Sequence, residues 1–130
     1  MQTTGNVSFS SLSHLVYDLN TANVIGGTDN DLFKITGNLT LDGILDIHGG
    51  PDFTGGTYTL MTFTGTLTNN GLILGTVPLD DFPNMQVIIQ INISGGGGSV
   101  LLSVPEPASV GVISLLMMGM LARRNRGVIL

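Results

Sequence analysis

The sequence contains no cysteine and no tryptophan, and it is poor in charge. Without cysteine there is no disulfide scaffold, no thiolate metal ligand and no cysteine nucleophile. Only 10% of the residues are charged, whereas about a quarter is ordinary for a soluble domain. Lys34 is the only basic residue before Arg123. Because neutralising phosphates takes clustered lysine and arginine, we expect no nucleic-acid binding by the first hundred residues.

The first residues also lack the features of an export signal. Residues 1–9 contain neither a basic segment nor an apolar run, and a secretory signal peptide needs both. The far end of the chain nevertheless has a membrane-like segment. We therefore expect that the natural chain begins upstream and that the sequence is truncated at its N-terminus.

Helical periodicity is absent before residue 104, and apolar residues alternate with polar ones instead. This period of two predicts strands at His14–Leu19 and Phe33–Thr36. A further strand begins at Tyr58 and reaches Phe63 if a bulge lies near Met61, and the clearest alternation covers Met85–Ile93.

Glycine, asparagine and aspartate punctuate these segments. Asp42-Gly43 is predicted as a turn between a strand at Leu39–Leu41 and another at Leu45–Ile47. Residues 69–71, Asn-Asn-Gly, are predicted as a turn before Leu72, and residues 95–98 as a loop between neighbouring strands.

Many short strands at spacings of about 8–12 residues predict an all-β domain over residues 1–103. Periodicity alone does not decide between a β-sandwich and a β-solenoid. Residues 37–43 and 65–71 echo each other, which favours stacked coils. We therefore predict a short β-solenoid, with the β-sandwich as the alternative.

The composition changes abruptly at Val104. Val104-Pro105-Glu106-Pro107 is extended because proline fixes φ. An uncharged apolar run, 108–122, follows and predicts one transmembrane α-helix, although a full crossing takes about 20 residues. Its end is basic, with Arg123, Arg124 and Arg126 placed to hold its orientation by the positive-inside rule.

This order of three parts, over 104–127, resembles the PEP-CTERM sorting signal of biofilm-forming Gram-negative bacteria. The resemblance implies export through the inner membrane, temporary anchoring by the helix, and cleavage near Pro105-Glu106-Pro107 by an exosortase, a multi-pass membrane protease. The mature protein would then reach the cell surface or extracellular matrix. The apolar extension Val128-Ile129-Leu130 departs from the family, which usually stops at its arginines.

The preceding domain has a resemblance of its own. Residues 31–43 and 56–60, followed by a terminal strand pair, look like the last turns of an autotransporter-type right-handed β-helix. This resemblance supports the solenoid over the sandwich, and it carries no catalytic residues.

Few residues suggest chemistry. His14 and His48 have no nucleophile motif near them, and neither Asp42 with Asp46 nor the adjacent pair Asp80-Asp81 is placed like an acid/base pair. We therefore expect no enzymatic activity.

The residues 29–31, Asp-Asn-Asp, place oxygen donors on one loop, which makes Asp29 and Asp31 a weak candidate calcium site. The alternative is that these residues simply form the turn. No other cofactor is expected.

The predicted function is structural or adhesive: an exported, biofilm-associated matrix or cell-surface protein. Its predicted partners are the exosortase, the inner membrane before processing, and extracellular polysaccharide or matrix. The alternative is a surface-displayed glycan-binding module, which the shortage of aromatic residues disfavours.

Overall fold

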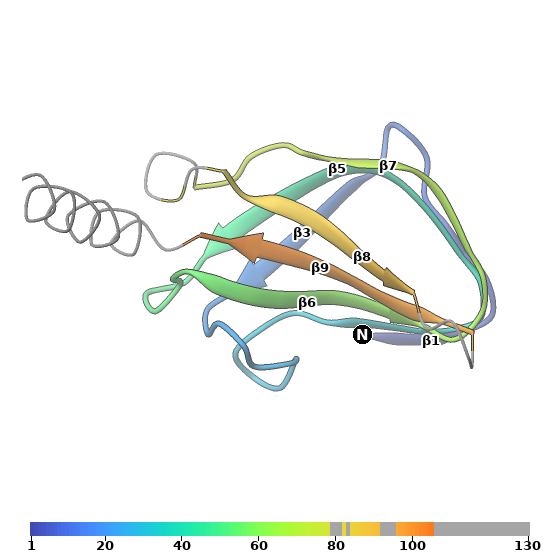
Figure 1. Ribbon diagram of the computed structural model, residues 1–130, viewed down its shortest axis with the longest axis horizontal. Helices are drawn as coiled ribbons and strands as arrows, with labels where there is room; N and C mark the ends of the chain where they lie inside the picture. The colour runs from blue at the N-terminus through green and yellow to red at the C-terminus, as the bar shows by residue number, and fades with distance from the viewer. Residues whose placement is uncertain (79–81, 83, 92–95, 106–130) are drawn as a thin grey trace, which may run out of the picture.

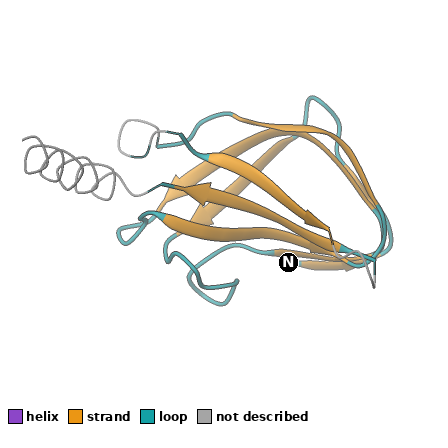
Figure 2. Cartoon of the chain, in the orientation of Figure 1, coloured by secondary structure: helices purple, strands orange, loops and turns teal. Residues whose placement is uncertain are grey.

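A computed structural model describes residues 1–78, 82, 84–91 and 96–105. Within these ranges the chain consists of strands and loops, and no helix is found (Figure 2). The all-β prediction is therefore confirmed for this part of the chain. No helix within the described ranges is long and apolar enough to cross a bilayer. The predicted membrane helix at 108–122 lies outside them.

Nine strands form two sheets (Figure 1). Sheet A has the order β1-β4-β6-β9-β8, and in sheet B both β2 and β3 pair with one side of β5, while β7 pairs with the other. The strands are β1 Gln2–Thr4, β2 Val7–Ser8, β3 His14–Leu19, β4 Phe33–Thr36, β5 Leu39–Gly49, β6 Gly56–Phe63, β7 Leu67–Leu74, β8 Gln86–Ile91 and β9 Gly98–Val104.

The first seven strands stack as three successive coils. Each coil contributes a strand to sheet A, turns a corner and contributes to sheet B, and equivalent strands of neighbouring coils pair in parallel. The echo seen in the sequence is this stacking, because Leu39 lies opposite Leu67 and Thr40 opposite Thr68. Parallel pairing of chain-adjacent coils favours the solenoid, since sandwiches are built from antiparallel sheets.

The corners are held by a ladder that runs from coil to coil. The Asn38 backbone N–H donates to Oδ1 of Asn6 at 3.0 Å, and the Thr66 backbone N–H donates to Oδ1 of Asn38 at 2.8 Å. Gly37 precedes the middle corner at φ +152°, and a Cβ there would collide with the Gly5 carbonyl. Asparagine and glycine thus recur at the corner for different reasons: one closes the ladder, the other lets the backbones approach.

The third coil is closed by an antiparallel strand pair. β9 pairs antiparallel with β6 and with β8, which confirms that the glycine-rich loop joins neighbouring strands. β6 has an irregularity between Thr59 and Met61, so the predicted bulge is also confirmed.

Two predicted turns are wrong. Asp42-Gly43 lies inside β5, and Asn69-Asn70-Gly71 lies inside β7. The two sites face each other in a bulge, where Leu41 pairs with Asn69 and Gly43 pairs with Leu72. Gly43 and Gly71 have φ values of +104° and +99°. The glycines bend a continuous strand because parallel pairing on both sides leaves β5 no room to reverse.

The core lies between the two sheets. It is built from the inward residues of β3, β5, β6 and β9, and its fully buried members are Leu19, Ile35, Leu39, Leu41, Leu45, Tyr58, Leu60, Met61, Val100 and Leu102. Alternation thus places one apolar face of each strand inside and leaves the polar faces outside.

Candidate functional site

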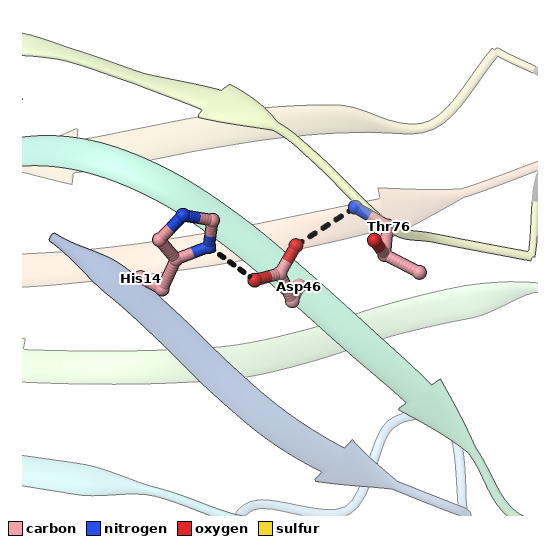
Figure 3. A network of polar contacts seen from close by, with 3 residues as sticks. All are labelled: His14, Asp46 and Thr76. Carbon is pink, nitrogen blue, oxygen red and sulfur yellow. Dashed lines mark hydrogen bonds and ion pairs between the residues drawn. The ribbon is translucent and has the colours of Figure 1, made fainter. Parts of the chain in front are cut away.

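A histidine and a carboxylate from different coils meet on the outer face of sheet B (Figure 3). Nδ1 of His14, at the start of β3, lies 2.7 Å from Oδ2 of Asp46 on β5. The other oxygen, Oδ1, accepts a hydrogen bond from the backbone N–H of Thr76 at 2.8 Å. One carboxylate therefore joins all three coils.

These contacts act on the charge of Asp46. The hydrogen bond from His14, and then the backbone hydrogen bond from Thr76, lower the pKa of the Asp46 carboxyl below its ordinary value. The carboxylate form is favoured because both contacts donate to it or pair with its charge.

A second pair lies further along the same strands. Nδ1 of His48 lies 3.2 Å from Oδ1 of Asp18, and both side chains are largely exposed. Asp18 is directly opposite His48 in the ladder, so this contact also joins the first and second coils. Exposed pairs of this kind contribute little stability one by one.

The arrangement lacks the parts of a nucleophilic site. A His–carboxylate pair becomes catalytic when the second ring nitrogen faces a hydroxyl or thiol. Among the described residues no hydroxyl is hydrogen-bonded to His14 or His48. What the pairs do here is connect coils.

The candidate calcium residues are employed by their own loop. Asn30 is 6% exposed, and Oδ1 of Asn30 accepts from the backbone N–H groups of Asn20 and Thr21, while Nδ2 donates to the carbonyls of Thr21 and Val24. Oδ2 of Asp31 accepts from the backbone N–H of Asp18. No group of three His, Cys, Asp or Glu able to hold a metal is found within the described ranges. These residues thus shape the loop, as in the alternative reading.

The sorting residues lie at the edge of the described chain. Val104 is the last residue of β9, pairs with Gly56 and is 2% exposed, and Pro105 is half-buried. The strand therefore extends one residue past the predicted domain boundary at 103. Glu106, Pro107, Arg123, Arg124 and Arg126 lie outside the described residues, as does the Asp80-Asp81 pair.

Sequence reasoning missed the His14–Asp46 pair, although a signal for it exists. The two residues are 32 positions apart, the same spacing that separates Asn6 from Asn38 in the corner ladder. A search for polar residues repeating at this spacing would have brought His14 and Asp46 together.

The two sheets also differ in charge on their outer faces. The outer face of sheet B carries Asp18, Asp42 and Asp46 with the two histidines. Within the described residues, sheet A shows no carboxylate there; its outward side chains are Gln2, Thr4, Lys34, Thr36, Thr57, Thr59, Thr62, Gln86, Ile88, Gln90, Ser99, Leu101 and Ser103. One face of an acidic protein is thus nearly neutral.

No known family model matches the chain. Over 97 residues, which is 72% of this chain, the sequence is 40% identical to the Adhesin BmaC autotransporter of Brucella suis biovar 1 (strain 1330). The matched region is 3% of that protein's length. The chain is thus similar to a small part of a very large adhesin.

Proposed function

We propose that this chain is a non-enzymatic adhesive module displayed at the cell surface. The observation that carries the proposal is the 40% identity to an autotransporter adhesin over 72% of the chain. The parallel stacking of coils supports it, because this is how an autotransporter-type β-helix is built and extended. A rigid stack of this kind presents long, regular outer faces to a partner.

Adhesion is tested by displaying the full chain on a non-adherent bacterial host and counting cells that adhere to surfaces coated with matrix polysaccharide or host-cell protein. Leu102→Asp, which places a charge in the core where Leu102 is 0% exposed, gives an unfolded control at matched display. We expect several-fold more adhesion with the native sequence than with the control. Equal adhesion of the two would contradict the proposal.

The route to the surface is the second part of the proposal. We propose that the segment from Val104 is a PEP-CTERM-like tag, that an exosortase cuts near Pro105–Pro107 after inner-membrane anchoring, and that the product joins a biofilm matrix. The structure supports a cut at this place because β9 ends at Val104, so cleavage beyond it leaves every described strand intact.

Intact-mass measurement of the protein isolated from its host tests this route. A mature C-terminus near Pro105–Pro107 is the expected result. A chain that still ends at Leu130 in a host with an exosortase would leave the tail as an ordinary membrane anchor.

A second candidate is a glycan-binding module, and the outer face of sheet A favours it. Hydroxyl and amide side chains both donate and accept hydrogen bonds, and the near-neutral face suits an uncharged polysaccharide. Glycan-array binding by the full chain, weakened by Thr57→Asp on β6 and unchanged by Thr68→Asp on β7, would support it. Both threonines are exposed, so the pair is matched. Equal loss with both variants would argue against this face.

A further inference from the structure

β3 is the outermost strand of sheet B at the N-terminal end of the stack. On one side it pairs with β5, from His14 opposite Ile44 to Leu19 opposite Gly49. Its other edge carries N–H and C=O groups that a further strand can bind. Residues 30–32 lie against part of this edge.

Asp31 closes the edge at Asp18. The backbone N–H of Asp31 donates to the Asp18 carbonyl at 3.0 Å, and Oδ2 of Asp31 accepts from the Asp18 N–H at 2.8 Å. Beside them Leu19 and Asn30 form an antiparallel bridge. Asp31 thus offers Asp18 the donor and the acceptor that a neighbouring strand would offer.

This cap is anchored at both ends. The four hydrogen bonds of the buried Asn30 amide tie it to residues 20–24. After Asp31, the carbonyl of Leu32 accepts from the Met1 amino group at 2.9 Å. The segment 30–32 is therefore held on the edge by contacts outside β3.

The rest of the edge is open. Alternate residues of a strand direct their backbone groups to the same edge, so Val16 and His14 face the side that Asp18 faces. The described residues form no hydrogen bond with these two on that side. Val16 is 53% exposed. Half of the edge is thus capped and half is not.

β3 is complementary to itself. In an antiparallel pair centred on Val16, His14 lies opposite Asp18 of the second copy, and Leu15 lies opposite its Tyr17. Oppositely charged cross-strand pairs stabilise such ladders. Among the described contacts His14 uses Nδ1 and Asp18 uses Oδ1, so Nε2 and Oδ2 face no described side-chain partner.

The surroundings of β3 also suit a second copy. A hollow of about 290 Å³ lies beside the strand, and Phe9, Leu15, Tyr17, Leu32 and Phe33 are among the residues that line it. A two-fold axis through Val16 brings the hollows of the two copies together and removes their apolar walls from water.

We propose that β3 is a dimerisation edge that pairs with β3 of a second copy, and that the segment Asn30–Leu32 is a built-in cap that keeps this edge closed. The inference goes beyond the adhesive function and does not depend on it.

Disulfide trapping in the full chain tests the proposal, since the sequence has no cysteine of its own. Val16→Cys places one thiol on the proposed axis, where cross-strand Cα atoms lie within disulfide range. With Asp31→Ala added, we expect oxidation to yield covalent dimers at least tenfold faster than with Val16→Cys alone. Equal rates in the two variants, with β-sheet retained by circular dichroism, would overturn the proposal.

Two controls separate this edge from other contacts. Asp29→Ala removes a carboxylate from the same loop and should leave the rate for Val16→Cys unchanged. Ile73→Cys is exposed on β7, and Asp31→Ala should not accelerate its cross-linking. Acceleration at Ile73 equal to that at Val16 would mean general aggregation and would also overturn the proposal.

Hydrogen exchange in the unmodified chain reads the cap if Asp31→Ala does not fold. The closed cap requires slow exchange of the Asp18 amide and fast exchange of the Val16 amide, although both lie on one edge of one strand. Equal exchange at the two amides would show that Asp31 does not protect the edge.

Discussion

At the scale of single residues, buried or shared polar groups hold this fold in place. Asn30 and Asp46 each bridge segments that are distant in the sequence, and neither has a charge partner in a catalytic arrangement. Their removal therefore tests stability, and the pH at which Asp46 acts can be derived from the direction of its pKa shift.

Replacing Asn30 by alanine should destabilise the protein by about 2 kcal/mol, because backbone N–H and C=O groups in the loop 20–24 lose their partners. The midpoint of urea unfolding measures this. Asn30→Asp retains Oδ1 as an acceptor and loses only the Nδ2 donors, so it should fall between the two. An unchanged midpoint for Asn30→Ala would mean that the loop does not need its plug.

Stability should fall at acid pH partly through Asp46. Its pKa is lowered from 3.8 in the folded chain by His14 and Thr76, so its contribution is complete above the unfolded value and is lost as pH falls through the folded value. Urea unfolding between pH 6 and 2 measures the slope. Asp46→Asn should flatten the profile below about pH 4, and Asp29→Asn is the control that should not. Parallel profiles for the native chain and Asp46→Asn would contradict this.

At the scale of elements, glycines at the same bulge have different demands. Gly43 and Gly71 have similar positive φ values, but a Cβ at Gly43 would lie 2.6 Å from the Ser13 carbonyl oxygen, whereas at Gly71 no atom lies within 4 Å. The difference arises because β5 has a neighbour on each side at this point and β7 has only β5.

Gly71→Ala should therefore cost about 1 kcal/mol from backbone strain alone, and Gly43→Ala should cost clearly more because the first coil must also move. Thermal or urea unfolding of the two variants compares them directly. Equal losses would indicate that the two coils are not in van der Waals contact at the bulge.

At the scale of the whole molecule, the described core is complete by Val104. The buried residues of both sheets lie between Leu15 and Val104, and β9 places the last of them against β6. The tail is therefore not needed to cover the core.

A chain that ends at Pro105 should fold with the same far-UV circular dichroism spectrum as the full chain and unfold cooperatively. Size-exclusion chromatography should show a compact species. A disordered spectrum would mean that the residues after 105 contribute to the fold, and it would also place the proposed cleavage site inside a structural unit.

The sequence by itself determined the all-β class, most strands and the inward face of each, because side-chain alternation is a local property of strands. It also pointed to stacked coils, through the echo of residues 37–43 and 65–71. Only the tertiary structure decided that Asp42-Gly43 and Asn69-Gly71 continue their strands, since a glycine bends or reverses a chain according to the neighbours it meets. The alternation of Leu39, Leu41, Leu45 and Ile47 continues unbroken through Gly43, which was a local sign of one strand. His14 with Asp46, and Asp31 with Asp18, came together through coil stacking and loop folding, which bring residues distant in the chain into contact.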